Sequence, residues 1–203
     1  MIVCDFEGTI YNEAKLRRDF RRVFGSFDLD FETIFRKTAK HGHFCLEALN
    51  RTSLKKSQKA RIIQECKKLI GNGSVYVFAD AKQFLQKNLG KVSILSYGSS
   101  EFQKEKIVGS GIAKFIKQVE ITQLHKRESK DLFLKADIYI DNDPTVLQEI
   151  SQSFNKIKLY LIDRDNKCDV IPDNIIKVKD LAEVKNVESR RIKTKKQKDR
   201  SKI

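Results

Sequence analysis

The sequence lacks any long apolar run. No stretch of about 18 apolar residues occurs in the 203-residue chain, so we expect no membrane-spanning helix. The first apolar run ends at Asp5 and has no basic residue before it, which does not resemble a secretory signal peptide. With 40% hydrophobic and 33% charged residues, the composition predicts a water-soluble protein with one core domain and a modest insertion.

The sequence also lacks paired cysteines. Cys4, Cys45, Cys66 and Cys168 are scattered and form no C-x-x-C pair, so we interpret them as reduced thiols of a cytoplasmic protein. The segment HGH at 41–43 has no cysteine nearby, which makes it a poor zinc signal and favours a surface turn.

Acidic residues are outnumbered, and the formal net charge is +14. Such a charge attracts anions, which include nucleic acids, nucleotides and small phosphorylated compounds. Residues 187–203 are strongly basic, and we expect them to form a disordered tail that contacts nucleic-acid phosphates weakly, without reading sequence. Nothing in the sequence indicates an oligomeric state.

Six short runs rich in Val, Ile and Tyr predict β-strands. They are nearly continuous in apolar character and are separated by helical patterns, which indicates a parallel sheet covered on both faces. The fold class predicted is therefore α/β. The runs are residues 1–4, 92–98, 118–122, 137–141, 157–163 and 174–178.

Helix signals surround these runs. Ser100 and Gln103 have the spacing of a capping box, and Pro144 suits the first turn of a helix. Residues 12–73 contain no strand pattern, and their apolar residues recur at helical spacing. We therefore predict a core of residues 1–11 and 74–186, interrupted by a small helical insertion at 12–73.

Polar side chains stand at the ends of three predicted strands: Asp5, Ser96 and Asp141. Ligands of open parallel sheets bind beyond the carboxyl ends of the strands, so these side chains converge if the first strand is central. Two neighbouring acids repel each other unless a positive charge lies between them. Mg²⁺, which combines one or two carboxylates with waters and a phosphate, is the natural candidate.

Four segments together resemble motifs of the haloacid dehalogenase superfamily of phosphohydrolases. They are MIVCDFEGTI, VSILSYGSS, QLHKRESK and DIYIDNDP, and the similarity extends over about residues 1–186. The resemblance implies a Rossmann-like parallel-sheet core with a small α-helical cap inserted after the first strand.

The resemblance also implies catalytic roles. Asp5 would attack phosphorus and form an aspartyl-phosphate. Glu7 would protonate the leaving oxygen and then activate water. Ser96 would donate to a phosphoryl oxygen. Lys126, with Lys130 as the alternative, would neutralise the nucleophile and the developing charge.

Binding roles follow from the same resemblance. The nucleophile loop and the second motif would surround the phosphate through Gly8, Thr9 and Gly98. The metal ligands would be Asp5, the backbone carbonyl of Glu7 and Asp141. Asp143 or Asn142 would contact the metal through water or from behind the ligands.

One position departs from the family pattern, because Glu7 stands where the family has Asp. Its carboxylate reaches one methylene further, and a misplacement of about 1 Å can cost on the order of a hundredfold in rate. Glu7 therefore acts from an altered rotamer, supports slow turnover, or marks a protein that no longer hydrolyses.

The surface of the helical insertion is basic. Arg17 and Arg21 are candidates for binding an anionic group of the substrate, although a solvated helix face is the simpler interpretation.

Three hypotheses follow. The first is a Mg²⁺-dependent phosphatase for a small phosphorylated metabolite. The second keeps that chemistry but acts on nucleotides or nucleic-acid ends. The third is a catalytically retired binding protein that uses its basic surface.

Overall fold

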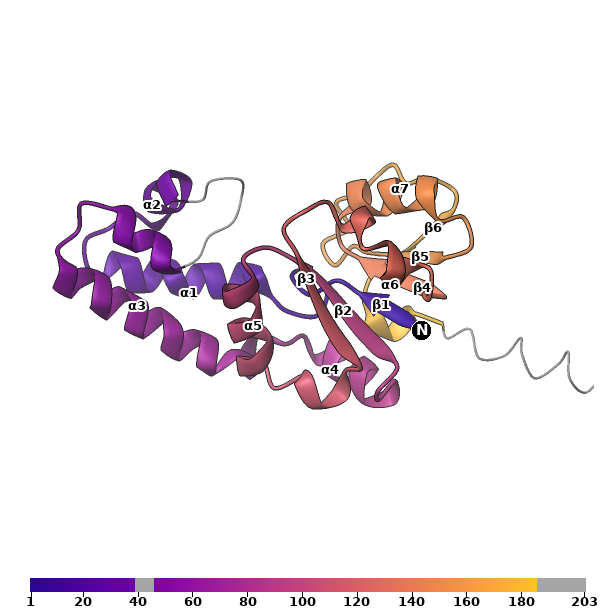
Figure 1. The fold of residues 1–203 in the computed structure, drawn as a ribbon, viewed down its shortest axis with the longest axis horizontal. Coiled ribbons are helices and arrows are strands. Elements are labelled where there is room, and N and C mark those ends of the chain that lie inside the picture. Colours follow the sequence, from indigo (N-terminus) through magenta and orange to yellow (C-terminus); the bar gives the residue numbers. More distant parts are fainter. Residues whose placement is uncertain (39–45, 186–203) are drawn as a thin grey trace, which may run out of the picture.

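A six-stranded parallel sheet forms the centre of the protein. The computed structural model describes residues 1–38 and 46–185 (Figure 1). The strand order is β3-β2-β1-β4-β5-β6, and every neighbouring pair is parallel. The predicted α/β class and all six predicted strands are confirmed. The strands are β1 Ile2–Cys4, β2 Val92–Tyr97, β3 Gln118–Thr122, β4 Ile138–Asp141, β5 Lys158–Ile162 and β6 Ile175–Val178.

Strand β1 is central and completely buried. Because side chains alternate across a strand, Cys4 and Val3 point to opposite faces of the sheet and belong to different hydrophobic clusters. One face is covered by α4 Ala79–Lys87 and α5 Ser100–Gly109. The other is covered by α6 Lys130–Phe133 and α7 Pro144–Ser153. Burial on both faces explains why the strands read as continuous apolar runs.

Between β1 and β2 the chain forms a helical lobe, which is defined here as α1, α2, η2 and α3. In Figure 1 it lies beside the sheet, on the side of α5. No strand occurs in the described part of residues 12–73, as predicted. The limits of the insertion as a domain stay a prediction. The helices are α1 Glu13–Gly25, α2 Phe31–Thr38, the 3₁₀ helix η2 Leu46–Arg51 and α3 Lys56–Gly71.

Apolar stripes hold the lobe together. Leu16, Phe20 and Phe24 line the buried face of α1, and the Phe24 and Phe31 rings meet edge to face at 5.1 Å. Asn12 caps α1 by accepting a hydrogen bond from the backbone N–H of Lys15. The HGH segment, Cys45 and the predicted basic tail lie outside the described residues.

Two predicted helix starts have different outcomes. Helix α7 begins at Pro144 as predicted, and the Asp143 carboxylate caps it. The predicted capping box at Ser100 is wrong, because the cap residue of α5 is Ser99 and its side chain makes no capping hydrogen bond. Gln103, the partner expected in that box, instead turns its side chain toward Glu7.

The remaining short helices connect these elements. They are the 3₁₀ helices η3 Gly73–Tyr76, η4 Ala113–Phe115, η5 Lys126–Glu128 and η6 Leu181–Glu183. Within the described ranges, none of the helices has the length and apolar character needed to cross a membrane.

Helix α5 joins the lobe to the sheet through a backbone contact. A Cβ atom added at Gly109 would lie 1.9 Å from the carbonyl oxygen of Ile70 in α3. Lys67 of α3 and Glu105 of α5 form an ion pair at 3.3 Å beside this contact. Glycine at position 109 therefore lets α3 pack directly on α5.

We expect Gly109→Ala to destabilise the protein by about 1–3 kcal/mol, because the added methyl must push the two helices apart. Gly71→Ala is the matched control, since nothing lies within 4 Å of a Cβ atom at that position. Urea unfolding of both variants measures the difference. Equal stability of the two variants would contradict the proposed contact.

Candidate functional site

The loop after β1 places the first candidate residue. Asp5 directly follows β1 and is buried. The backbone then folds back on itself, because the N–H groups of Ile10 and Tyr11 both donate to the carbonyl of Phe6. Gly8 has φ +79°, and a Cβ atom there would lie 2.5 Å from Nδ2 of Asn142. A glycine is needed at position 8 both for this backbone conformation and for the close approach of Asn142.

A buried lysine joins the ends of β1 and β4. Lys126, at the start of η5, donates from Nζ to Oδ1 of Asp5 at 2.5 Å and to Oδ2 of Asp141 at 2.8 Å. All three side chains are buried. The structure thus brings Asp5, Asp141 and Lys126 together, whereas Lys130 lies exposed on α6.

Burial and charge shift the pKa values of Asp5 and Lys126 in opposite directions. Asp5, Asp141 and Lys126 are called the triad here. Burial raises the pKa of Asp5 to about 7, because the Lys126 ammonium only partly offsets the loss of hydration and Asp141 adds repulsion. Burial lowers the pKa of Lys126, but the two carboxylates outweigh this effect and hold it above its ordinary value. Lys126 therefore carries its charge throughout the physiological pH range.

Tyr139 is a site residue that the sequence pattern did not single out. Its hydroxyl, fully buried, donates to Oδ2 of Asp141, and the N–H of Asp143 donates to Oδ1 at 3.0 Å. With Lys126, these donors fix the Asp141 carboxylate from three sides. The available signal was spacing, since residues two apart on a strand share a face.

The side-chain amide of Asn142 lies over the loop that follows β1. It is 2.8 Å from the carbonyl oxygen of Glu7, 3.2 Å from Oδ2 of Asp5 and 3.3 Å from Oγ1 of Thr9. With its nitrogen facing these atoms, the amide donates hydrogen bonds and cross-links the ends of β1 and β4. With its oxygen facing them, the amide oxygen lies beside three others, which belong to Glu7, Asp5 and Thr9.

That second arrangement fits a magnesium ion. Mg²⁺ binds oxygen ligands octahedrally at about 2.1 Å, which puts neighbouring ligands roughly 3 Å apart. The Asn142 position lies 2.8 Å from the Glu7 carbonyl oxygen and 3.2 Å from Oδ2 of Asp5, and both distances match this spacing. Among residues 1–38 and 46–185, no group of three His, Cys, Asp or Glu side chains could hold a metal. This set differs in kind, because it contains one carboxylate, one carbonyl and one amide.

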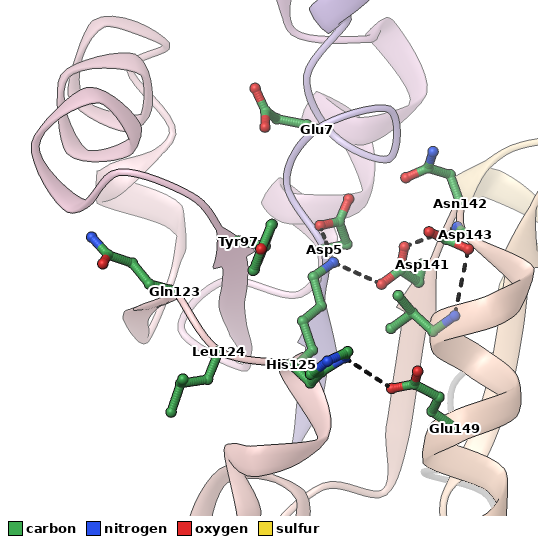
Figure 2. A pocket seen from close by; sticks show the side chains of 12 residues that line it. Asp5, Glu7, Tyr97, Gln123, Leu124, His125, Asp141, Asn142, Asp143 and Glu149 are labelled. Atoms are coloured by element: carbon green, nitrogen blue, oxygen red, sulfur yellow. Dashed lines mark hydrogen bonds and ion pairs between the residues drawn. The ribbon is translucent and has the colours of Figure 1, made fainter. Parts of the chain in front are cut away.

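The Glu7 side chain turns away from Asp5 (Figure 2). Its carboxylate forms an ion pair with Lys106 of α5 and accepts a hydrogen bond from Nε2 of Gln103 at 2.9 Å. The structure therefore brings the backbone of Glu7 to the site but directs its carboxylate toward α5. Lys106 was not identified from the sequence, because lysines are common throughout this chain.

Ser96 and Gly98 lie at and just beyond the end of β2. The Ser96 hydroxyl is buried and has no hydrogen-bond partner among the described residues. Gly98 has φ +143°, and a Cβ atom there would lie 2.8 Å from Nε2 of Gln103. Ser96 therefore offers a hydroxyl donor. Gly98 leaves room for the Gln103 side chain, which contacts Glu7.

Arg17 and Arg21 lie on α1 and pair with acids of the lobe. Arg21 donates to Glu32 at 2.6 Å, and Arg17 lies 3.5 Å from Glu13. Neither arginine lines the cavity described next, so their contact with substrate stays a prediction.

A cavity of about 500 Å³ opens beside the triad. We call it the acidic cavity, because its described lining carries five carboxylates but no arginine. His125 and Glu149 face each other across its rim at 3.6 Å (Figure 2). Its lining residues are Asp5, Glu7, Tyr97, Gln123, Leu124, His125, Lys126, Asp141, Asn142, Asp143, Val146 and Glu149.

Arg164 contacts the loop that follows β1. It donates to the carbonyl of Thr9 at 2.8 Å and to both carboxylate oxygens of Asp80. Its guanidinium group lies 3.7 Å from the centre of the Phe78 ring. The sequence gave no indication of this role, because the partners are far apart along the chain.

We expect Asp5→Asn to stabilise the metal-free protein above pH 7. The folded protein holds the pKa of Asp5 at about 7, above its ordinary 3.8, so folding favours the protonated acid. Stability from this group is therefore present below pH 3.8 and is lost as the pH rises to about 7. Replacing the ionising acid should raise Tm on the order of 5 °C at pH 8.

Thermal unfolding in EDTA at pH 8 and near pH 4 measures this effect, and the gain should disappear at the lower pH. A lower Tm of the variant at pH 8 would show that the ion pair with Lys126 outweighs the cost of burying Asp5.

Comparisons with known proteins support the fold. No family model and no curated protein sequence match the chain. A protein of Burkholderia xenovorans LB400 that is assigned to the haloacid dehalogenase-like hydrolases is 20% identical, with a TM-score of 0.62 over 89% of this chain and 92% of that chain.

Two further structures are similar. YfnB of Bacillus subtilis, assigned to the same hydrolases and bound to magnesium, is 14% identical, with a TM-score of 0.58 over 90% of this chain and 95% of that chain. The L-2-haloacid dehalogenase of Xanthobacter autotrophicus is 14% identical, with a TM-score of 0.50 over 82% and 78%. The chain therefore has the fold of the haloacid dehalogenase-like hydrolases, as its motifs predicted.

Proposed function

We propose that the protein is a Mg²⁺-dependent phosphatase, which hydrolyses the phosphate monoester of a small molecule through an aspartyl-phosphate. The observation that carries the proposal is the contact of Lys126 with both Asp5 and Asp141 in the lining of a cavity. A buried carboxylate beside a fixed ammonium is suited to attack phosphorus, because the ammonium offsets the charge that develops.

Each of the site residues has a separate role in the proposed reaction. An oxygen of Asp5 attacks phosphorus while Lys126 neutralises the carboxylate. The Ser96 hydroxyl, which has no protein partner in the described chain, donates to a phosphoryl oxygen. Magnesium, held by Asp5, the Glu7 carbonyl and Asn142, would supply positive charge to the phosphate. Water then attacks the phosphorus of the aspartyl-phosphate and restores the carboxylate.

The helical lobe favours a small substrate. It follows the nucleophile loop directly and packs on α5, which also contacts Glu7. We propose that it acts as a cap, which excludes water and supplies contacts to the substrate. Action on nucleotide or nucleic-acid ends remains the alternative, and a steep loss of affinity with added salt would favour it.

Dehalogenation is a second candidate, because of the position of Glu7. When a carboxylate displaces a halide from carbon, the leaving group needs no proton, so the withdrawn Glu7 would not matter. The free Ser96 hydroxyl and the oxygens around Asn142 favour phosphate and magnesium instead. Release of chloride from L-2-chloropropionate distinguishes this candidate from the phosphatase.

We expect the purified protein to hydrolyse p-nitrophenyl phosphate with Mg²⁺, and Asp5→Asn to lower kcat about a thousandfold or more. Rapid acid quenching should trap one phosphoryl group on the wild-type chain, detected by intact mass. Asp131→Asn, which changes an exposed aspartate of α6, is the matched control. Equal turnover by wild type and Asp5→Asn would refute the phosphatase. It would favour the hypothesis of a binding protein that no longer hydrolyses.

We expect Asn142→Asp to tighten Mg²⁺ binding roughly tenfold, because a charged ligand replaces a neutral one. Asn142→Ala should weaken it. Calorimetric titration with Mg²⁺ alone measures both, and Asn72→Asp, an exposed change at the end of α3, is the control. Unchanged affinity in both Asn142 variants would exclude this residue as a ligand.

A further inference from the structure

Helix α5 holds the Glu7 carboxylate with two side chains. Lys106, which is 1% exposed, forms an ion pair with it and lies 4.5 Å from the centre of the Phe102 ring. A buried ammonium without a partner is costly, so this pair resists separation. We call Glu7, Lys106 and Gln103 the α5 clasp.

The backbone after β2 is shaped to complete the α5 clasp. Gln103 donates from Nε2 to Oε2 of Glu7 at 2.9 Å and to the carbonyl of Tyr97 at 3.0 Å. Gly98, with φ +143°, leaves room for that nitrogen, because any Cβ atom would collide with it. The clasp therefore receives contributions from β2 and α5, and is not a chance contact of one flexible side chain.

The α5 clasp removes the expected proton donor from the leaving group. Glu7 points away from Asp5, as Figure 2 shows. Of the other donors that line the acidic cavity, Lys126 bridges two carboxylates and His125 lies 3.6 Å from Glu149 at the rim, while Tyr97 and Gln123 are further members of the set. The Tyr139 hydroxyl donates to Asp141. The carboxylate expected to protonate the leaving oxygen is therefore held by Lys106 and Gln103, and Lys126 is held by two carboxylates.

We propose that the substrate carries its phosphate on a weakly basic oxygen, such as that of a phenol, an enol, a carboxylate or a second phosphate. The bond from Asp5 oxygen to phosphorus forms as the bond to the leaving oxygen breaks, and that oxygen takes the electron pair and departs as an anion. Lys106 and Gln103 are positioning residues, which keep Glu7 out of this step. The inference rests on the proposed phosphatase and adds its substrate class.

The same arrangement affects the second step. Water that attacks the aspartyl-phosphate must lose a proton, and Glu7 in the α5 clasp is not placed to accept it. The aspartyl-phosphate should therefore accumulate, and p-nitrophenol should appear in a burst equal to the enzyme concentration.

The experiment compares phosphate esters whose leaving groups differ in basicity. Wild type should hydrolyse p-nitrophenyl phosphate on the order of a hundredfold faster than glycerol phosphate, which is the lower range expected when general acid catalysis is missing. The shorter side chain in Glu7→Asp cannot reach Lys106 and Gln103 of α5, and Lys106→Met removes the ion pair. Each variant should therefore reduce this ratio about tenfold and diminish the burst. Lys104→Met, an exposed change on α5, should alter neither.

The outcomes separate the two proposals. If p-nitrophenyl phosphate shows no turnover that depends on Asp5, the proposed phosphatase is refuted, and the proposed substrate class is refuted with it. If turnover depends on Asp5 but wild type treats both esters alike, and Glu7→Gln slows only glycerol phosphate, then Glu7 does protonate the leaving group. The phosphatase would then stand and the α5 clasp would be overturned. Circular dichroism establishes that each variant is folded, and Glu7→Asp keeps the test decisive if Lys106→Met does not fold.

Discussion

The structure of the site depends on one ammonium group placed between two buried carboxylates. Without Lys126, Asp5 and Asp141 would repel each other at the ends of adjacent strands. Asp141 is held by Lys126, Tyr139 and the N–H of Asp143, and it orients the lysine, whereas its role as a metal ligand stays a prediction. The oxygens proposed to hold magnesium lie around the other oxygen of Asp5, where Asn142 faces the loop that follows β1. One oxygen of Asp5 thus faces Lys126, and the other faces Asn142.

The sequence predicted what depends on local pattern and on the geometry of parallel sheets. Continuous apolar runs identified the six strands, and the common direction of the strands predicted that Asp5 and Asp141 would meet. Contacts between distant segments were not predictable. From the sequence pattern Arg164 is an ordinary loop residue, and only the fold shows that it contacts Thr9. Gln103 has capping-box spacing, yet the fold offers it a charged acceptor in Glu7, and this competing hydrogen bond prevails.

The net charge of the chain is a poor guide to the charge of its cavity. The chain carries +14, but carboxylates dominate the described lining of the acidic cavity. The basic side chains of α1 explain part of this difference, because Arg17 and Arg21 pair with acids of the lobe and do not point into the cavity. The overall charge acts at a distance and attracts anions. In the described lining of the cavity, Lys126 is the one lysine or arginine side chain.

Helix α5 contacts both the helical lobe and the side chain of Glu7. The face with Glu105 and Gly109 packs on α3, whereas the face with Gln103 and Lys106 holds Glu7. An aspartate at position 7 would be one methylene shorter and would reach less far toward α5. The longer glutamate reaches α5, so the position of this carboxylate depends on a helix that also supports the lobe. A shift of the lobe on α5 would therefore change the surroundings of Glu7 without moving Asp5, because Asp5 is anchored separately by Lys126.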